Sequence, residues 1–574
     1  MARARATRRK KFKAKRSNAP ALTASGKEAE RQWKLPVPKR HNIAVAAILV
    51  LILANALYYG LTHYEGASQY GDDVVYLYLG SSVAHGVYTI SSFIFSVRLM
   101  EAFPIGVFYT LFGVNDLSST AWNLLSYVGI IIVTFLIGRF LYNNKAGLLS
   151  AFLVSIFPLV TKYAVNVGED IPLAFLGGLA VLFFLHAERN GSRWYYLMSG
   201  VLLVAVWLTS YEGAIVIAFV FLYAIIEILR KKIQLNREPL FFIFGIVIAF
   251  LITFIYSQLS SNCAFCVITT NTNFYSAVAG SAGGASTIPS ANTDLSFYIQ
   301  SMFQYGALNA FNTHNLSNTI SYFSNQLFGQ IQNSEYGLYF YALVPAAALL
   351  LAFRERRSYF LVFWFLFSFL FLEFGPMHVG VSLNPPSITY LLAHRLLRFM
   401  LVAAIPLCCI IGIGLAKLLE FRNKILVSGF AVAVVLLFAM LYANNYFISN
   451  FWYLWEHYPE QLVMQAVNFI KPLPMNTTIY LEGQFNNANV GYSASMINTY
   501  LGDPLANRVN YSIAANVSCS SLKSGSYIIW SGPPKCPNWS NALNITVPKD
   551  IPSYVVSAEN PNLNDRPTNV YRIN

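Results

Sequence analysis

Charged side chains are scarce in this chain of 574 residues. Asp, Glu, Lys and Arg together make up 11% of the sequence, whereas they make up about 25% of an average soluble domain. Hydrophobic residues account for 56%. So few charges cannot cover the surface of a soluble protein of this size, which excludes a soluble cytosolic enzyme. The long apolar runs instead predict an all-α polytopic membrane protein.

Eleven apolar segments, each close to the roughly 20 residues that span a bilayer, follow one another along the chain. They are residues 43–63, 119–142, 146–162, 171–187, 194–210, 213–229, 239–258, 338–353, 359–373, 399–417 and 425–446. No signal-peptide cleavage pattern follows the first segment, so we expect it to remain as a membrane anchor.

Lys and Arg are distributed unevenly between the loops that join these segments. If the N-terminus is cytosolic, the short loops on that side carry 14 of them, and the opposite side up to residue 447 carries four. The four are Arg98, Lys162, Arg395 and Arg398. Positively charged loops stay in the cytosol. The distribution therefore predicts a multi-pass protein of the cell (plasma) membrane, with its N-terminus inside and its C-terminus outside.

This topology divides the chain into three domains. Residues 1–41 form a basic cytosolic tail, residues 42–447 a transmembrane domain with extracytoplasmic loops 64–118 and 259–337, and residues 448–574 a small external domain. The tail holds fourteen Lys and Arg against two Glu. With no fold around these charges, we expect it to bind membrane lipids and no nucleic acid. Short β-like runs and five Asn-x-Ser/Thr sequons predict that the C-terminal domain is extracytoplasmic and α/β or β-rich.

Cysteines are few, with six in the whole chain. Cys519 and Cys536 in the external domain are able to form a disulfide, and so are Cys263 and Cys266. A single Cys-x-x-Cys pair with no second ligand pair is a weak indication of a metal site, so a disulfide or free thiols are expected there.

Acidic residues gather on the side of the membrane that the topology places outside. They are Asp72, Asp73, Glu101, Glu169, Asp170 and Glu212. Ionisable side chains near a bilayer are energetically costly and often mark functional sites. Carboxylates beside a few cations can hold a divalent metal or accept a proton, and the cations can bind a phosphate. Any one of these residues has a simpler interpretation as the solvated end of a helix, but the joint pattern favours a site.

Four short motifs in series resemble elements of a known superfamily. Residues 71–76 (Gly-Asp-Asp-Val-Val-Tyr) are similar to a first-loop Asp-Glu/Asp-x-x-Tyr element, and residues 98–113 are similar to a Glu-x-x-Pro-x-Gly…Leu-Phe-Gly stretch. Residues 169–175 resemble an Asp-x-Pro-Leu-x-Phe helix opening, and residues 398–406 resemble an Arg-Tyr/Phe…Pro start to a late span. The motifs occur in the order found in the GT-C glycosyltransferases, in particular the protein O-mannosyltransferases and the lipid A aminoarabinose transferases.

The resemblance implies a GT-C fold with about eleven transmembrane helices, N-terminus in and C-terminus out. It also implies a membrane glycosyltransferase whose active site faces outside. The donor would be a hexose or pentose linked to a polyprenyl (dolichyl) phosphate, such as a mannosyl donor. The acceptor would be a protein or a lipid-linked glycan, and the transfer would invert the anomeric carbon.

The resemblance also implies roles for individual residues. Asp72 takes a proton from the acceptor as general base, a role that typically contributes about 10²–10⁴-fold in rate. The other acidic residues of the catalytic pocket are Asp73, Glu101 and Asp170. The residues that neutralise the donor phosphate are Arg398, Lys162, Arg98 and His394. Metal use differs among members, and a divalent cation (Mg²⁺ or Mn²⁺) held by Asp72 and Asp170 is compatible with the family.

One departure from the family and two alternative functions accompany this interpretation. Relatives of the lipid A type often have Lys after the Glu of the second motif, where this chain has Ala102. An oligosaccharyltransferase catalytic subunit is the first alternative, but the Trp-Trp-Asp-Tyr-Gly motif of that family is missing, and residues 452–456 (Trp-Tyr-Leu-Trp-Glu) come closest to it. A membrane transporter is the second alternative. The lack of an internal repeat, and charges placed at an interface and not at the midplane, disfavour it.

Overall fold

A computed structural model describes most of the chain between residues 40 and 420 and parts of the C-terminal region. The described residues are 40–64, 72–91, 93–230, 237–270, 339–352, 359–374, 376–383, 386–392, 397–420, 439, 442–443, 464–474, 477–482, 501, 509–513, 519–531, 534–544 and 568–574. Residues 1–46 and 47–574 form two separate units, and the site lies in the second. Several predicted features lie outside the described residues: the basic tail up to residue 39, most of loop 259–337, most of segment 425–446, and His394.

Helices dominate the membrane domain, and their positions follow the hydropathy of the sequence. They are α2 (Arg40–His63), α3 (Asp73–Ala84), α4 (Leu99–Phe112), α5 (Asp116–Leu141), α6 (Asn144–Ser155), α7 (Pro158–Ala164), α8 (Asp170–Asn190), α9 (Arg193–Trp207), α10 (Gly213–Leu229), α11 (Arg237–Ser261), α15 (Tyr339–Ala352), α16 (Tyr359–Phe374) and α17 (Ala404–Leu418), with the short 3₁₀ helices η1 (Ile94–Val97) and η3 (Leu397–Ala403). Each apolar segment predicted from 43–63 to 399–417 coincides with one of these helices or with a consecutive pair, α6–α7 or η3–α17.

The lengths of the helices support a membrane protein. Within the described residues, five helices are long and apolar enough to cross a bilayer alone. The pair α6–α7, bent by 59°, adds a sixth crossing if it is one broken span. Pro158, the first residue of α7, accounts for the break because proline lacks an N–H and favours the first turn of a helix. The chain is therefore an integral membrane protein, while the predicted total of about eleven spans remains a prediction.

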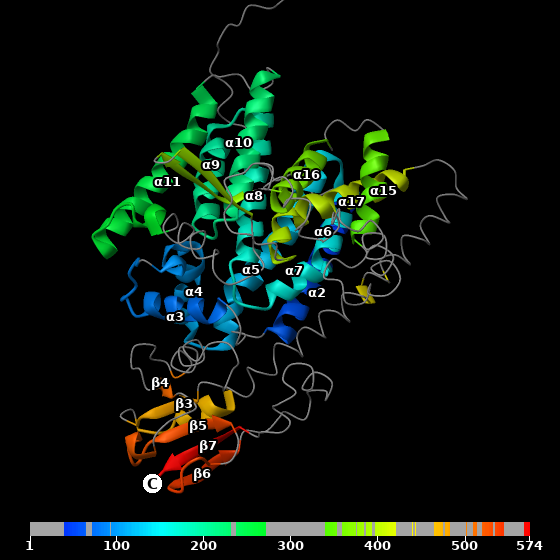
Figure 1. Ribbon diagram of the computed structural model, residues 1–574. Coiled ribbons are helices and arrows are strands. Elements are labelled where there is room, and N and C mark those ends of the chain that lie inside the picture. The colour runs from blue at the N-terminus through cyan, green and yellow to red at the C-terminus, as the bar shows by residue number, and fades with distance from the viewer. Residues whose placement is uncertain are drawn as a thin grey trace, which may run out of the picture. The chain divides into compact units, whose positions relative to one another are not determined.

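Close helix packing brings α8 into the middle of the bundle (Figure 1). α8 packs against α5, α9 and α10, and α9 packs against α11. Gly200 on α9 and Gly245 on α11 allow the last contact, because a Cβ at either position would overlap the backbone of the facing helix. Small residues at such crossings are a common way for membrane helices to associate.

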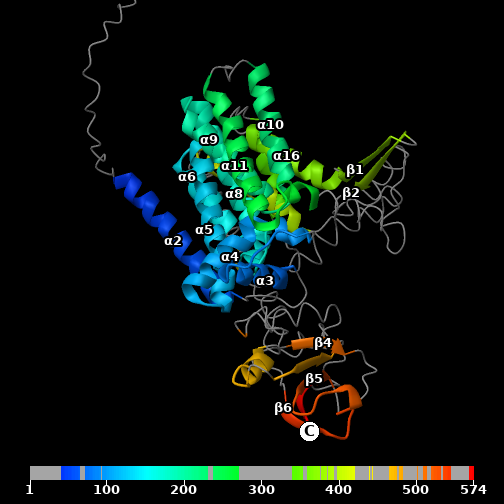
Figure 2. The ribbon, with the colours of Figure 1, turned by 90° about the vertical axis from the view of Figure 1, so that its left-hand side faces the viewer.

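Helices α3 and α4 lie across one end of the bundle (Figure 2). They pack against each other, and α4 packs against α5. The backbone N–H of Met100 donates to the carbonyl of Leu208, 3.1 Å away, which ties α4 to the turn between α9 and α10. The predicted first loop is thus largely helical, and it holds its polar residues over the ends of the long helices.

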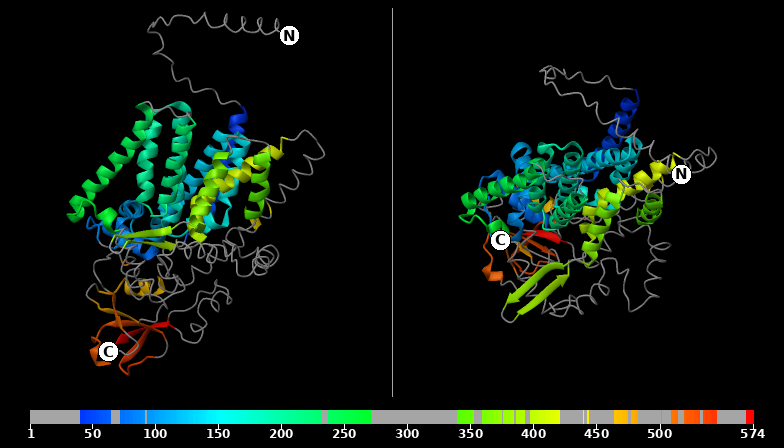
Figure 3. Two further views of the ribbon diagram at one scale, coloured as in Figure 1. Left: turned by 45° about the horizontal axis from the view of Figure 1, so that its top comes forward. Right: turned by 90° about the horizontal axis from the view of Figure 1, so that it is seen from above.

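Two β-structures complete the described fold (Figure 3). β1 (Pro376–Leu383) and β2 (Pro386–Leu392) pair as an antiparallel hairpin. The C-terminal region forms a five-stranded mixed sheet in the order β4 (Val509–Ile513), β3 (Ile479–Glu482), β5 (Tyr527–Ser531), β7 (Thr568–Ile573) and β6 (Trp539–Asn544). Both disulfides that were considered possible from the sequence are present, Cys263–Cys266 and Cys519–Cys536.

Candidate functional site

Arg398 lies between two aspartates that are far apart in the sequence. Its Nη2 donates a hydrogen bond to Asp72 Oδ2 at 3.3 Å, and its Nε lies 3.9 Å from Asp170 Oδ2. Asp72 immediately precedes α3, Asp170 is the first residue of α8, and Arg398 belongs to η3. Three residues predicted from separate motifs therefore form one ionic cluster.

The members of this cluster differ in their exposure. The side chains of Asp72 and Arg398 are 31% and 27% exposed, whereas the side chain of Asp170 is 7% exposed. The Nε of Arg398 is buried, and 3.9 Å is too long for a hydrogen bond to Asp170, so it has no hydrogen-bond acceptor within the described part of the chain. Asp72 and Arg398 are thus the two members that a substrate is able to reach.

A second arginine forms a buried network next to the first. Arg98, just before α4, pairs with Glu169 and also donates to the hydroxyl of Tyr76, which donates to Glu169 in turn. The side chains of Arg98 and Glu169 are 9% and 3% exposed. The Arg98 guanidinium also lies 4.6 Å from the ring centroid of Phe95. Because Glu169 precedes Asp170 and Tyr76 lies one helical turn after Asp72, this network fixes the two aspartates relative to each other.

A hydrogen bond from α5 also holds the turn that precedes α8. The side-chain amide of Asn123 on α5 donates to the carbonyl of Gly168 at 2.9 Å. This contact fastens the turn between α7 and α8 to the long helix α5, so that the backbone of Glu169 and Asp170 is anchored independently of their side chains.

Six acidic residues of the site stand at the N-terminal ends of helices. They are Asp72 before α3, Asp73 at the start of α3, Glu101 in the first turn of α4, Glu169 and Asp170 at the start of α8, and Glu212 before α10. Unpaired backbone N–H groups and the helix dipole make such ends favourable for negative charge. This local preference explains how so many carboxylates are accommodated within one buried region.

Glu101 and Glu212 interact electrostatically with Glu169 and Asp170, and they are 0% and 5% exposed. Burial raises the pKa of Glu101 well above its ordinary value, and the carboxylates of Glu169 and Asp170 raise it further. Burial likewise raises the pKa of Glu212 to about 8, although Arg98 opposes the shift. The hydroxyl of Ser210 donates to Glu212. Burial therefore favours the neutral form of both carboxyl groups.

The exposed carboxylate has a perturbed pKa as well. Burial raises the pKa of Asp72 above its ordinary value, and Glu169 adds to this, while Arg398 and Arg98 oppose it. The pKa of Glu169 moves in the other direction: burial would raise it, but Arg98, Arg398 and the Tyr76 hydroxyl together hold it below its ordinary value. A carboxylate with a raised pKa accepts a proton more readily, which suits Asp72 to the task of a base.

The other predicted site residues are placed as follows. Asp73 is buried at the start of α3, 4% exposed. Lys162 on α7 is 8% exposed, and its Nζ lies 5.2 Å from the ring centroid of Tyr163. Arg98 is directed toward Glu169 and Tyr76, and its predicted contact with the donor phosphate stays a prediction. The sequence placed Glu169 and Glu212 in the acidic cluster and Tyr76 in the first motif, but it did not reveal the partners of these residues.

The predicted Mg²⁺ or Mn²⁺ site does not fit the side chains as they lie. Within the described residues, no three His, Cys, Asp or Glu side chains converge in the way that metal ligands do. Asp72 and Asp170 instead share the guanidinium of Arg398, which supplies the positive charge that a cation would bring. We therefore assign no step to a metal ion.

Comparison with known proteins agrees with the geometry. Residues 97–256 match the sequence model of the family described as dolichyl-phosphate-mannose-protein mannosyltransferase. This segment is less than half of the chain, but it contains Arg98, Glu101, Glu169, Asp170 and Glu212. No curated protein sequence matches the chain.

Solved structures of two kinds of enzyme share the fold. ArnT from Cupriavidus metallidurans bound to undecaprenyl phosphate matches with 14% identity and a TM-score of 0.50, over 92% of this chain and 98% of that one. The oligosaccharyltransferase of Archaeoglobus fulgidus in the apo form matches with 11% identity and a TM-score of 0.50, over 81% of this chain. The same archaeal enzyme in complex with Zn and sulfate matches with 12% identity and a TM-score of 0.48, over 79% of this chain and 61% of that one.

This chain spans 64% of the length of the archaeal oligosaccharyltransferase in its apo form. At these identities the structures establish a common fold and no more. The resemblance to GT-C proteins that was inferred from four motifs is confirmed by the family match and by this fold.

Proposed function

We propose that this chain, a glycosyltransferase of the GT-C type, transfers one sugar from a polyprenyl monophosphate donor to an acceptor outside the cell membrane. One observation carries the proposal: Asp72 and Asp170 converge on Arg398, and of these three only Asp72 and Arg398 have substantially exposed side chains. A base beside an exposed guanidinium suits a reaction that removes a proton and releases a phosphate.

The proposed step is a direct displacement at the anomeric carbon. The acceptor oxygen forms a bond to that carbon while the bond from the carbon to the phosphate oxygen breaks, and the configuration inverts. Asp72 takes the proton of the acceptor. The polyprenyl phosphate leaves already charged and needs a cation more than a general acid, and Arg398 supplies that cation.

Arg398 also links donor binding to activation of the base. In the structure, Asp72 accepts a hydrogen bond from one N–H group of Arg398. A guanidinium has five N–H donors and pairs well with phosphate oxygens. We infer that a donor phosphate displaces Asp72 from Arg398 and thereby leaves its carboxylate available to the acceptor. Glu169, Arg98 and Tyr76 hold the two aspartates in place during this exchange.

The description of the matched family favours a protein acceptor, and a lipid-linked glycan is the other acceptor class that suits the fold. An oligosaccharyltransferase activity is the second candidate function, supported by the shared fold with the archaeal enzyme. It would move a whole glycan to an Asn acceptor. The two activities therefore differ in the size of the glycan that is transferred and in the acceptor residue.

The test uses purified full-length protein and a panel of polyprenyl monophosphate sugars, with one polyprenyl-linked oligosaccharide as the competing donor. Each is offered with Ser/Thr peptides, Asn-sequon peptides or lipid-linked glycans. We expect release of polyprenyl monophosphate, an inverted product, and a rate that falls about 10²–10⁴-fold in Asp72→Asn.

The matched control is Asp116→Asn, a carboxylate in the first turn of α5 on the same predicted side of the membrane. It should keep the wild-type rate. Transfer of the whole oligosaccharide to the Asn-sequon peptides alone would establish the second candidate function. Turnover of monophosphate donors by Asp72→Asn at the wild-type rate would remove Asp72 as the base.

A further inference from the structure

A second site lies at the opposite end of α8 from the acidic cluster and takes no part in the proposed reaction. Asp170 begins α8, and Glu188 follows eighteen residues later. At about 1.5 Å per residue this is about 27 Å, close to the roughly 30 Å thickness of a hydrocarbon core. A cavity of about 880 Å³ opens around Glu188, within the roughly 300–1,000 Å³ range of small-molecule sites.

Four helices surround this cavity: the C-terminal ends of α5, α8 and α10 and the N-terminal end of α16. Most of its wall is apolar or aromatic, formed by Phe140, Leu141, Leu185, Ile226, Phe360 and Phe363. Of these helices, α5 and α8 are long and apolar enough to cross a bilayer, and α10 and α16 are shorter apolar helices. Molecules that reach the cavity from between such helices come from the membrane. An apolar wall at this depth is suited to acyl chains.

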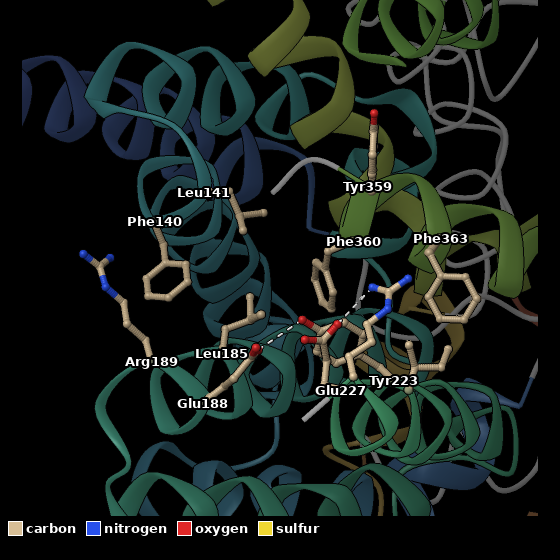
Figure 4. A pocket seen from close by; sticks show the side chains of 12 residues that line it. Phe140, Leu141, Leu185, Glu188, Arg189, Tyr223, Glu227, Tyr359, Phe360 and Phe363 are labelled. Carbon is tan, nitrogen blue, oxygen red and sulfur yellow. Dashed lines mark hydrogen bonds and ion pairs between the residues drawn. The ribbon is translucent and has the colours of Figure 1, made fainter. Parts of the chain in front are cut away.

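The polar part of the cavity contains two carboxylates close to a tyrosine. Tyr223 donates a hydrogen bond to Glu188 Oε2 at 3.1 Å, and Figure 4 shows Glu188 and Glu227 directed toward the same part of the cavity. The side chain of Glu227 is only 1% exposed. Aromatic rings and carboxylates together form a favourable environment for an organic cation.

Two arginines lie at the outer part of the same cavity. Arg230 Nη1 is 3.2 Å from Glu227 Oε1, but the Arg230 side chain is 64% exposed. Arg189 is also exposed, with its guanidinium 5.1 Å from the ring centroid of Phe140 (Figure 4). The loops beyond these helix ends are rich in Lys and Arg, as expected at the level of cytosolic lipid phosphates.

We propose that this cavity binds a membrane lipid with a zwitterionic ethanolamine phosphate head group. Its ammonium lies between Glu188 and Glu227, its phosphate is held by Arg230 or Arg189 nearer the surface, and its acyl chains follow the apolar wall. Two carboxylates and two guanidinium groups give a formal charge of zero, which matches a zwitterion. An anionic lipid would bring no cation to the two carboxylates.

The experiment compares lipids on the purified full-length protein. The protein is reconstituted with phosphatidylethanolamine, phosphatidylcholine or phosphatidylglycerol, and the lipid that remains bound after delipidation is measured by native mass spectrometry. We expect phosphatidylethanolamine to be retained best, then phosphatidylcholine, then phosphatidylglycerol. The choline ammonium has no N–H to donate, and the glycerol head group carries no cation. Glu188→Gln and Glu227→Gln should each weaken ethanolamine lipid binding about tenfold, the effect of one lost charge-assisted hydrogen bond.

Glu238→Gln is the matched control, because Glu238 lies in the first turn of α11 on the same predicted side but outside the cavity. It should bind the ethanolamine lipid as the wild type does. If either cavity variant fails to fold, the lipid series on the wild-type protein decides the question. Equal retention of the three lipids, a preference for phosphatidylglycerol, or a preference that survives both cavity variants would overturn the proposal.

Discussion

Two arginines meet acidic side chains on the same side of the bundle, and they do so in different ways. Arg398 spans Asp72 and Asp170 at 3.3 and 3.9 Å and remains 27% exposed. Arg98 is buried against Glu169 and Tyr76 and completes a closed set of hydrogen bonds. The comparison shows that two similar ion pairs differ in accessibility. The Arg398–Asp72 pair, called the open pair below, is exposed enough to exchange a partner for a substrate. The Arg98–Glu169 pair, called the closed pair, is buried and suited to hold the site together.

Breaking the closed pair should have the largest effect on stability. Arg98→Met leaves Glu169 buried without its cation, and loss of one partner of a buried pair costs about 3–5 kcal/mol. We expect a large fall in the melting temperature of the purified protein. Arg98→Met combined with Glu169→Leu removes both charges and should recover part of this loss. A double variant less stable than either single variant would contradict the scaffolding role.

Changing the open pair should affect substrate binding more than stability. Arg398→Lys keeps the positive charge but loses the planar guanidinium that pairs with a phosphate through two N–H groups. We expect the KM for the donor to rise about 10–100-fold, the effect of losing one or two charge-assisted hydrogen bonds, while the melting temperature changes little. An unchanged KM would show that the phosphate is bound elsewhere, for example by Lys162.

The pH dependence of transfer sharpens the role of Asp72. Burial raises the pKa of this carboxyl, and Glu169 adds to the effect, so Asp72 gains its proton at a higher pH than the roughly 3.9 of a free aspartate. A base must be ionised, and turnover should therefore fall as the pH drops through this raised pKa. As the pH is lowered, kcat/KM should begin to fall before the pH reaches about 4. A profile that stays flat down to that pH would speak against Asp72 as base.

The smallest expected effect concerns Glu212. Burial raises its pKa to about 8, against about 4.3 in an unfolded chain. Between these values the folded protein binds more protons than the unfolded one, so stability falls as the pH rises toward 8. Glu212→Gln cannot titrate and still offers an oxygen to Ser210. The melting temperature of the variant minus that of the wild type should therefore increase by a few degrees between about pH 5 and about pH 8. A difference that stays constant over this range would contradict the raised pKa of Glu212.

Hydropathy predicted the helical part of the fold well, because a bilayer demands long apolar helices. It could not predict that the segment bends by 59° just before Pro158, because the run of apolar residues continues through the bend. The hairpin β1–β2 was likewise not predicted. Its pairing depends on contacts between strands, which a count of apolar residues does not describe.

The candidate site was predictable where a residue belongs to a motif and lies on a known side of the membrane. Asp72, Asp170 and Arg398 met both conditions, and they lie together. Arg98 also met them, and it is buried against Glu169. Which of two similar arginines stays accessible depends on how α3, α4 and α8 pack, and this lies beyond sequence patterns.

Donor binding to the Asp72→Asn variant tests the central claim most directly. Asparagine cannot act as the base, and it no longer holds Arg398 through a charged pair. We therefore predict that a polyprenyl monophosphate sugar binds to this variant as tightly as to the wild type or more tightly, while single-turnover transfer is lost. Weaker donor binding together with transfer near the wild-type rate would contradict the account.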